Sequence, residues 1–166
     1  MQIFDAKGPF ILKPKKLKKG LMLTEESLNE FWYSIDELRS QRGIYVFGMR
    51  AGKGYTPWYV GQTKRSFEKE CSDRHKLHIY NEIMVSKKGT PIMFFLVQKN
   101  QKGPQNNSIL NHVEKYFINV ALAKNPDLFN VKGTKKPEWS VTGVMNASQG
   151  SSTKESRGFK KFIGLQ

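Results

Sequence analysis

Residues 43 to 61 read GIYVFGMRAGKGYTPWYVG, and this stretch decides the fold. Two β-prone runs, at 44–47 and 58–60, flank a segment at 51–57 that is rich in glycine and contains a proline. Branched and aromatic residues favour strands, whereas glycine and proline mark turns. The stretch therefore predicts a hairpin with one tyrosine, Tyr45 or Tyr59, in each strand.

Helical periodicity surrounds this hairpin. Apolar residues recur at helical spacing over 25–41, and partial apolar positions indicate a second helix over 66–86. A continuous apolar run at 92–97 is typical of a strand covered on both faces. A further helix begins at about residue 108 and is stopped by Pro126. This order predicts an α+β fold with a small, three-stranded, mainly antiparallel sheet flanked by helices.

The length of 166 residues fits one domain with a loose tail. We expect a basic N-terminal segment plus a helix at 1–42 and a core at 43–131. A C-terminal extension follows at 132–166, with a linker-like stretch at 146–152 that is rich in serine and asparagine.

Positive charge is the strongest global feature. Lysine and arginine number 28 against 14 aspartates and glutamates, so the net charge is +14. Such a potential attracts polyanions, and nucleic acid is the expected partner, although a lysine-rich surface alone gives the same count. The lysines are spread along the chain, and no apolar run approaches the ~18 residues that a membrane span needs. We therefore expect no membrane partner.

Cysteine usage and the N-terminus bear on the compartment. One cysteine, Cys71, cannot form a disulfide framework or a cysteine-based zinc site within one chain. The first residues, MQIFD, lack the basic start and apolar stretch of a secretory signal. A cytoplasmic protein is the expectation.

Glu114 is an anomaly in the last major helix. It lies four residues after Leu110 and four before Ile118, beside the apolar stripe. Buried carboxylates are normally paired or bound to metal. Glu114 is therefore either an edge residue paired with a cation such as Lys115, or a cation ligand where the helix meets the sheet.

The two hairpin tyrosines allow a similar choice. If Tyr45 and Tyr59 face the same side of the sheet, their hydroxyls form a polar-tipped aromatic wall. Tyrosines in strands are also common at the edge of a core, with no functional role.

Together these residues resemble the GIY-YIG nuclease superfamily. The resemblance covers about 43–131 and consists of Gly43-Ile44-Tyr45, Tyr59-Val60-Gly61, a basic helix with histidines, then Glu114 and Asn130. Either tripeptide alone is a weak signal, whereas the ordered set is fairly specific.

The resemblance implies a role for each matching residue. Tyr45 and Tyr59 match tyrosines at the scissile phosphate, one of which orients or deprotonates the attacking water. Gly61 matches a glycine that lets the backbone approach the substrate. Glu114 matches the sole protein ligand of a divalent metal, normally Mg²⁺ (or Mn²⁺), and Asn130 matches a structural or substrate-positioning asparagine.

The family's arginine and its following histidine are displaced in this chain. We expect Arg74 and His78, one turn apart, to fill these roles on the apolar face of the helix at 66–86. Arg65 and His75 compete for them, and a purely surface location is the alternative.

Basic residues outside these motifs are candidates for contacts to flanking phosphates, which position a polymer without reading its sequence. These candidates are Lys13, Lys15, Lys16, Lys64 and Arg65.

The expected function is a metal-dependent endonuclease that hydrolyses phosphodiester bonds of DNA. The alternative is a catalytically impaired protein of the same fold that binds nucleic acid without cleaving it. The displaced arginine motivates this alternative.

Overall fold

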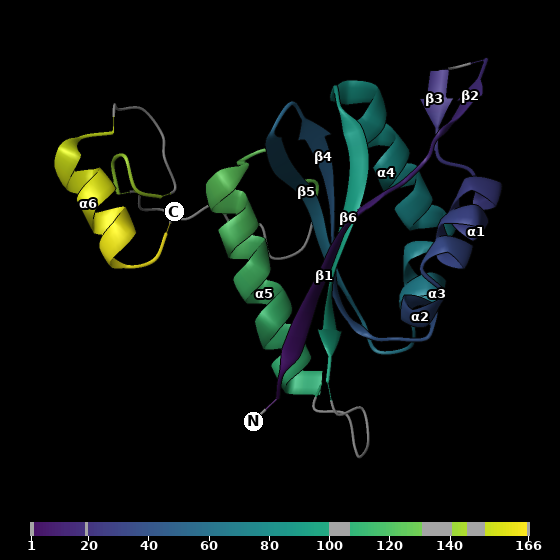
Figure 1. Ribbon diagram of the computed structural model, residues 1–166, viewed down its shortest axis with the longest axis horizontal. Helices are drawn as coiled ribbons and strands as arrows, with labels where there is room; N and C mark the ends of the chain where they lie inside the picture. Colours follow the sequence, from purple (N-terminus) through teal and green to yellow (C-terminus); the bar gives the residue numbers. More distant parts are fainter. Residues whose placement is uncertain (1, 19, 100–106, 131–140, 146–151, 166) are drawn as a thin grey trace.

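The computed structural model describes residues 2–18, 20–99, 107–130, 141–145 and 152–165. Its main sheet has four antiparallel strands in the order β1-β6-β4-β5 (Figure 1). These strands are β1 (Phe4–Ile11), β4 (Gly43–Ala51), β5 (Gly54–Thr63) and β6 (Thr90–Gln98). The α+β class is confirmed, and the expectation of three strands is wrong because β1 adds a fourth.

Strand β1 is an edge strand, which explains why its sequence lacks a clear strand pattern. It pairs with β6 alone, so only one side of its backbone needs partners. The register shifts between Lys7 and Phe10, around Gly8 and Pro9. Proline and glycine are tolerated at such an edge or bulge, and they also hide the strand pattern. The basic N-terminal segment also contains a small hairpin of β2 (Lys15–Leu17) and β3 (Gly20–Met22) before α1 begins.

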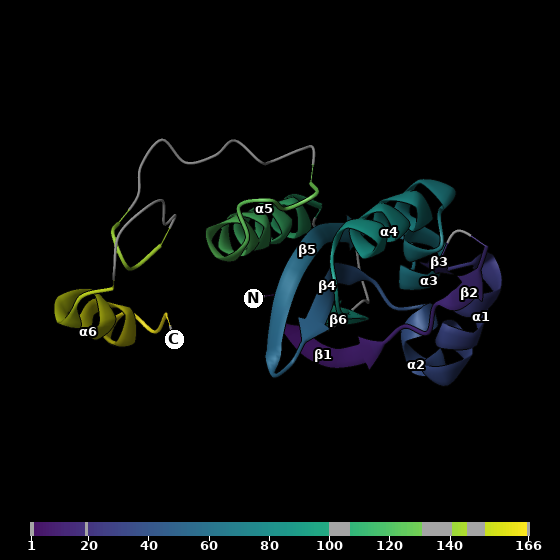
Figure 2. The same cartoon turned by 90° about the horizontal axis from the view of Figure 1, so that it is seen from above.

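Helices cover both faces of the sheet. One face carries α1 (Glu25–Ser34), α2 (Asp36–Arg39), α3 (Phe67–Cys71) and α4 (Arg74–Ser86), while α5 (Asn107–Lys124) lies on the other (Figures 1 and 2). The last described helix, α6 (Lys154–Phe162), is drawn to one side of this body in Figures 1 and 2. No helix in the described ranges is long and apolar enough to cross a membrane.

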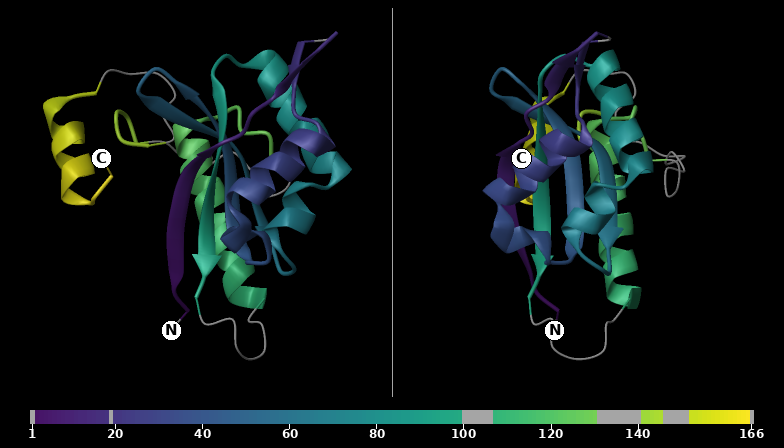
Figure 3. Two further views of the ribbon diagram at one scale, coloured as in Figure 1. Left: turned by 45° about the vertical axis from the view of Figure 1, so that its right-hand side comes forward. Right: turned by 90° about the vertical axis from the view of Figure 1, so that its right-hand side faces the viewer.

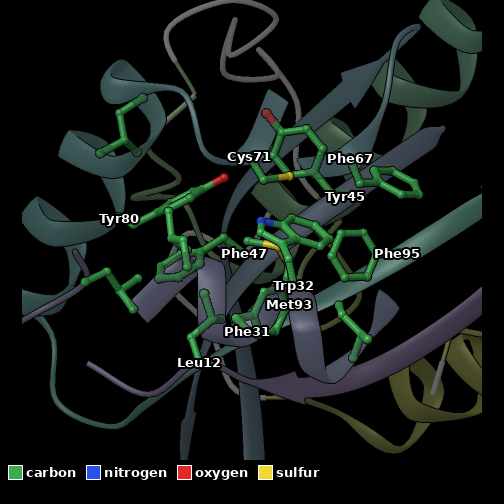
Figure 4. Packing of buried hydrophobic residues seen from close by; sticks show 14 of the residues in the cluster. Leu12, Phe31, Trp32, Tyr45, Phe47, Phe67, Cys71, Tyr80, Met93 and Phe95 are labelled. Atoms are coloured by element: carbon green, nitrogen blue, oxygen red, sulfur yellow. The ribbon is translucent and has the colours of Figure 1, made fainter. Parts of the chain in front are cut away.

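Side chains of β4 alternate between two cores. Tyr45 and Phe47 join the larger core under α1–α4, whereas Ile44 joins a smaller core under α5. In Figure 4, Tyr45 lies beside Cys71, and the rings of Phe47 and Tyr80 are stacked, with centroids 4.5 Å apart. A buried β4 therefore carries the first motif tyrosine into the larger core.

The two helices expected at 25–41 and 66–86 are each interrupted. The helix expected at 25–41 breaks at Ile35, whose backbone is non-helical (φ −132°, ψ 46°). The helix expected at 66–86 breaks at Ser72 and Asp73. Asp73 starts α4 as an N-cap, with its side chain accepting a hydrogen bond from the backbone N–H of His75 at 2.9 Å. Serine and aspartate compete with the helix for backbone hydrogen bonds, which explains a break that periodicity does not reveal.

Residues 125–130 cover the outer edge of β5. The Asn125 side chain donates to the Pro57 carbonyl at 2.7 Å, and the Phe129 N–H donates to the Trp58 carbonyl at 2.8 Å. Asn130 accepts from the Val60 N–H at 2.9 Å and donates to the Val60 carbonyl at 2.6 Å. An edge strand otherwise leaves such groups unpaired. This segment therefore completes the sheet at the strand that carries Tyr59.

Candidate functional site

The two motif tyrosines lie on the same face of the sheet, as one of the two sequence hypotheses required. Tyr45 stands opposite Gly61, and Phe47 stands opposite Tyr59, so the tyrosines are diagonal neighbours. Their ring centroids are 6.1 Å apart and their planes differ by 30°. Tyr45 is fully buried, whereas Tyr59 is half-buried, so Tyr59 is the outer ring of the pair.

Gly61 has a packing reason to be glycine. A Cβ atom built on Gly61 would overlap the phenol of Tyr45. The glycine of the second tripeptide therefore leaves room for the tyrosine of the first. The space beside Gly61 is filled by Tyr45 and not by a substrate. A role for Gly61 in the approach of the substrate stays a prediction.

Tyr45 is a neutral phenol. Burial raises its pKa well above the ordinary value, and the charges of Tyr80, Cys71, Tyr59 and Glu70 act in the same direction. Its hydroxyl is buried and has no hydrogen-bond partner among the described residues. A phenol in this state cannot serve as a base at neutral pH.

Tyr59 contacts a partly buried lysine. The Lys76 ammonium donates a hydrogen bond to the Tyr59 hydroxyl at 2.7 Å and lies 4.9 Å from the centre of its ring. The Glu70 carboxylate lies 3.6 Å from the same ammonium. Only 15% of the Lys76 side chain is exposed, which is unusual for a lysine. The three residues come from β5, α4 and α3.

Glu114 reaches the same region from α5, which packs against β5 from the other face of the sheet. Its side chain is half-buried, and burial raises the pKa of its carboxyl. The Lys76 charge and hydrogen bonds from the side chain and backbone of Gln62 lower that pKa in part, while the charge of Glu70 raises it further. The cation that acts on Glu114 is thus Lys76 on α4, rather than the expected neighbour Lys115.

A pocket of about 400 Å³ lies between these groups. Its polar lining consists of Tyr59, His75, Lys76, Glu114 and Asn130. Its lining comes from β5, α4, α5 and the segment at 129–130. Figures 2 and 3 show α4 and α5 on opposite faces of the sheet that contains β5. An ammonium, a phenol and a carboxyl that is costly to ionise therefore face one cavity.

Arg74 and His78 do not line this pocket. The Arg74 side chain is 94% exposed, and its Nε lies 3.8 Å from a Glu25 carboxylate oxygen on α1. His78 is also exposed, with Nε2 3.4 Å from a Glu82 carboxylate oxygen. The expectation that these two residues join the tyrosines and Glu114 is wrong in its geometry.

The helix break explains this error. The expectation placed Arg74 and His78 on one continuous helical face with Phe67 and Cys71. The chain instead changes direction at Ser72–Asp73, so the face of α3 does not continue into α4.

The periodicity of α4 itself contained a signal for Lys76. Lys76 stands three, four and seven residues before Ile79, Tyr80 and Ile83, which are all buried. A lysine on an apolar stripe is the same kind of anomaly as Glu114 in α5. His75, the competing candidate for the histidine role, does line the pocket.

The other expected basic contacts lie on the surface. Lys64 and Arg65 are exposed on the loop between β5 and α3, and Lys13 and Lys16 are exposed near the N-terminus. Lys15 is half-buried and forms ion pairs of 2.7 and 3.0 Å with α1 glutamates. Contacts of these residues with phosphate stay predictions.

Asn130 performs the structural part of its expected role, since it holds both backbone groups of Val60. It also lines the pocket. Asn130 therefore both holds the backbone of β5 next to Tyr59 and forms part of the cavity wall.

Comparisons with protein-family models, with curated proteins and with solved structures returned no match. The pocket and the residues that line it are therefore the basis for assigning a function.

Proposed function

We propose that this chain is a metal-dependent endonuclease that hydrolyses phosphodiester bonds of DNA at the pocket beside β5. One observation carries the proposal: the Lys76 ammonium, the Tyr59 hydroxyl and the Glu114 carboxyl face one cavity of about 400 Å³. Hydrolysis of a phosphodiester needs positive charge near the phosphate, a positioned water molecule and a stabilised leaving oxygen. These groups fit the GIY-YIG resemblance, with a lysine where an arginine was expected.

The donor set of the pocket suits Mg²⁺ rather than a metal held by the protein alone. Among the described residues there is no group of three or more histidine, cysteine, aspartate or glutamate side chains that could hold a metal. Mg²⁺ keeps several waters and is commonly bound through one or two carboxylates together with substrate phosphates. Glu114 is the residue that would hold it, and a divalent cation there would favour the ionised carboxylate that burial disfavours. Bound at Glu114, Mg²⁺ would act as a Lewis acid and stabilise the leaving oxygen.

Tyr59, rather than Tyr45, is the residue suited to positioning water. Its oxygen accepts a hydrogen bond from Lys76, so its own proton is left to donate to a group in the pocket. Tyr45 stacks behind it as a neutral phenol. In this scheme Tyr45 fixes the ring of Tyr59, and Tyr59 holds the nucleophilic water for attack on phosphorus.

The net charge of +14 supports a polyanionic substrate. Exposed Lys64 and Arg65 follow directly after β5, so they are placed to contact phosphates that flank the bond to be cut. These contacts would align the strand without reading its bases.

Nicking of supercoiled plasmid tests the proposal. We expect conversion to the open-circular form when Mg²⁺ or Mn²⁺ is present and none when EDTA is added, measured by agarose gel electrophoresis. Retention of nicking in EDTA would contradict a metal-dependent mechanism. Absence of cleavage with every divalent metal, on duplex, branched and single-stranded DNA, would contradict the proposal as a whole.

A second candidate is a protein of this fold that binds nucleic acid without cleaving it. Its specific support is the pocket's cation, since the described residues of the lining provide the Lys76 ammonium and no guanidinium. A lysine is a point charge and cannot grip phosphate with two parallel hydrogen bonds as arginine does. This candidate predicts binding that weakens steeply between ~50 and 200 mM salt, with no product at any metal concentration.

Tyr45→Phe separates a chemical role of this residue from a packing role. The Tyr45 hydroxyl is buried with no partner in the described residues, so its removal is expected to leave folding stability unchanged or raise it by about 1 kcal/mol. Thermal unfolding measures this. We expect nicking to fall less than in Tyr59→Phe, because only Tyr59 lines the pocket. A greater loss of nicking in Tyr45→Phe, with normal stability, would assign the chemistry to Tyr45 instead.

A further inference from the structure

Lys76 is the one lysine among the described residues that line the pocket. Its ammonium contacts Tyr59 at 2.7 Å and Glu70 at 3.6 Å, and its side chain is 15% exposed. By contrast, the side chain of Arg74, two residues earlier on the same helix, is 94% exposed. The fold therefore draws Lys76 inward and leaves the neighbouring guanidinium in solvent.

The contacts of this ammonium do not use all of its hydrogen-bond donors. A charge removed from water needs close partners of opposite charge to offset its desolvation. The closest partner of Lys76 is the Tyr59 hydroxyl, and its carboxylate partner Glu70 is half-exposed and lies 3.6 Å away, beyond ordinary hydrogen-bond distance. An ammonium carries three N–H donors. The short hydrogen bond to Tyr59 takes one of them, so donor capacity remains on the side of the pocket.

Lys76 is a permanent cation. Burial by itself would lower its pKa, but the hydrogen bond to Tyr59 and the charges of Tyr59 and Glu70 outweigh burial and raise the pKa. The amine stays protonated at physiological pH, so it cannot act as a general base. Its available role is electrostatic.

We infer that Lys76 binds the phosphate of a nucleic-acid substrate, with Tyr59 and Glu70 holding its ammonium toward the pocket. This inference rests on the proposed function and assigns the phosphate contact to a residue outside the arginine and histidine positions of the family pattern. A phosphodiester group in the pocket would accept hydrogen bonds from the donors that Tyr59 does not use. Lysine is a common phosphate ligand of this point-charge type.

Glu114 makes this binding dependent on metal. Its carboxylate lies close enough to Lys76 for their charges to interact, so an incoming phosphate meets a cation and an anion in one cavity. Without a divalent metal, an ionised Glu114 opposes the phosphate. Removing the charge of Glu114 should therefore tighten binding in EDTA, whereas removing that of Lys76 should weaken it.

Binding of a short, fluorescently labelled single-stranded oligodeoxynucleotide in EDTA tests the inference without cleavage. We expect Lys76→Met to weaken binding about tenfold or more, the effect of one charged hydrogen bond. The slope of log affinity against log salt should become shallower by about 0.7, the value for one phosphate contact on a single strand. Lys76→Arg should retain most of the affinity, and Glu114→Gln should raise it.

Lys69→Met is the matched control. Lys69 is exposed on α3, and its replacement by methionine removes the same charge as Lys76→Met. Thermal unfolding of each variant shows that it folds, and Lys76→Gln is a second neutral variant if the methionine form is unstable. Equal losses in Lys76→Met and Lys69→Met would overturn the inference, since the effect would then be one of general charge. An unchanged affinity in both neutral Lys76 variants would also overturn it.

The two proposals fail in different ways. Binding that depends on Lys76 without cleavage at any metal would retain the phosphate contact and reject the nuclease. If Lys76→Met leaves both metal-dependent nicking and binding unchanged, the nuclease proposal stands and the phosphate contact of Lys76 is rejected.

Discussion

Glu114→Gln is expected to reduce Mg²⁺-dependent nicking by about 100-fold or more, the size of effect seen when one preorganised electrostatic group is removed from an active site. Glutamine keeps the shape of the side chain and can still contact Gln62, but it cannot provide an ionised oxygen for a divalent cation. The rate of open-circle formation at saturating Mg²⁺ measures the effect. Mn²⁺ should restore little, because the missing charge is the same for both metals.

The same substitution should make the metal-free protein more stable at neutral pH. Burial raises the pKa of Glu114 in the folded state, so folding disfavours its ionised form. The protonated carboxyl costs the folded protein nothing at low pH, but the protein loses folding stability as the pH rises through the folded-state pKa of Glu114. Glu114→Gln removes this loss. The melting temperature of the variant should exceed that of the parent at pH 7, and the difference should shrink as the pH falls below the ordinary glutamate pKa.

Glu82→Gln serves as the control for charge. Glu82 is exposed on α4 beside His78, so its replacement removes one negative charge away from the pocket. Neither nicking nor stability should change much. Loss of nicking in Glu114→Gln together with a lower melting temperature at neutral pH would point to misfolding and contradict the metal-ligand role.

Asn130→Ala should destabilise the fold by about 3 kcal/mol. The side chain of Asn130 satisfies the N–H and the carbonyl of Val60 at 2.9 and 2.6 Å, and both contacts are buried. Alanine leaves two buried backbone groups without these partners, and each such loss costs about 1–3 kcal/mol. Urea unfolding followed by circular dichroism measures the change.

Asn119→Ala is the comparison for Asn130→Ala, because Asn119 is exposed on α5. We expect a change within about 0.5 kcal/mol, typical of surface substitutions. Asn130→Asp should fall between the two, since a carboxylate can accept from the Val60 N–H but cannot donate to its carbonyl. Stability of Asn130→Ala equal to that of the parent would show that water replaces the amide and that the asparagine is not structural.

Features with a strong local pattern were predicted well. The run at 92–97 lies within β6, and the apolar spacing after residue 108 lies within α5. The hairpin at 43–61 was predicted correctly, although β4 and β5 extend into the expected turn. The linker-like stretch at 146–152 lies almost wholly outside the described residues. Strand β1 and the break at Asp73 were missed because neither produces a repeating pattern in the sequence. Strand β1 depends on pairing with β6, and the break depends on the hydrogen bond from the His75 N–H to the Asp73 side chain.

The sequence by itself determined the α+β class, the hairpin and the unusual position of Glu114, because these follow from the period of apolar residues along one segment. Only the tertiary structure decided which cation lies close enough to Glu114 for its charge to act on the carboxyl. Arg74, Lys76 and His78 are close in sequence, and the rotation of α4 after the Asp73 cap alone turns Lys76 inward and the other two outward. That rotation is set by packing of Tyr80 and Ile83 against the sheet. The period of α4 marks which of its residues turn inward, but it does not say which residues of another segment they face.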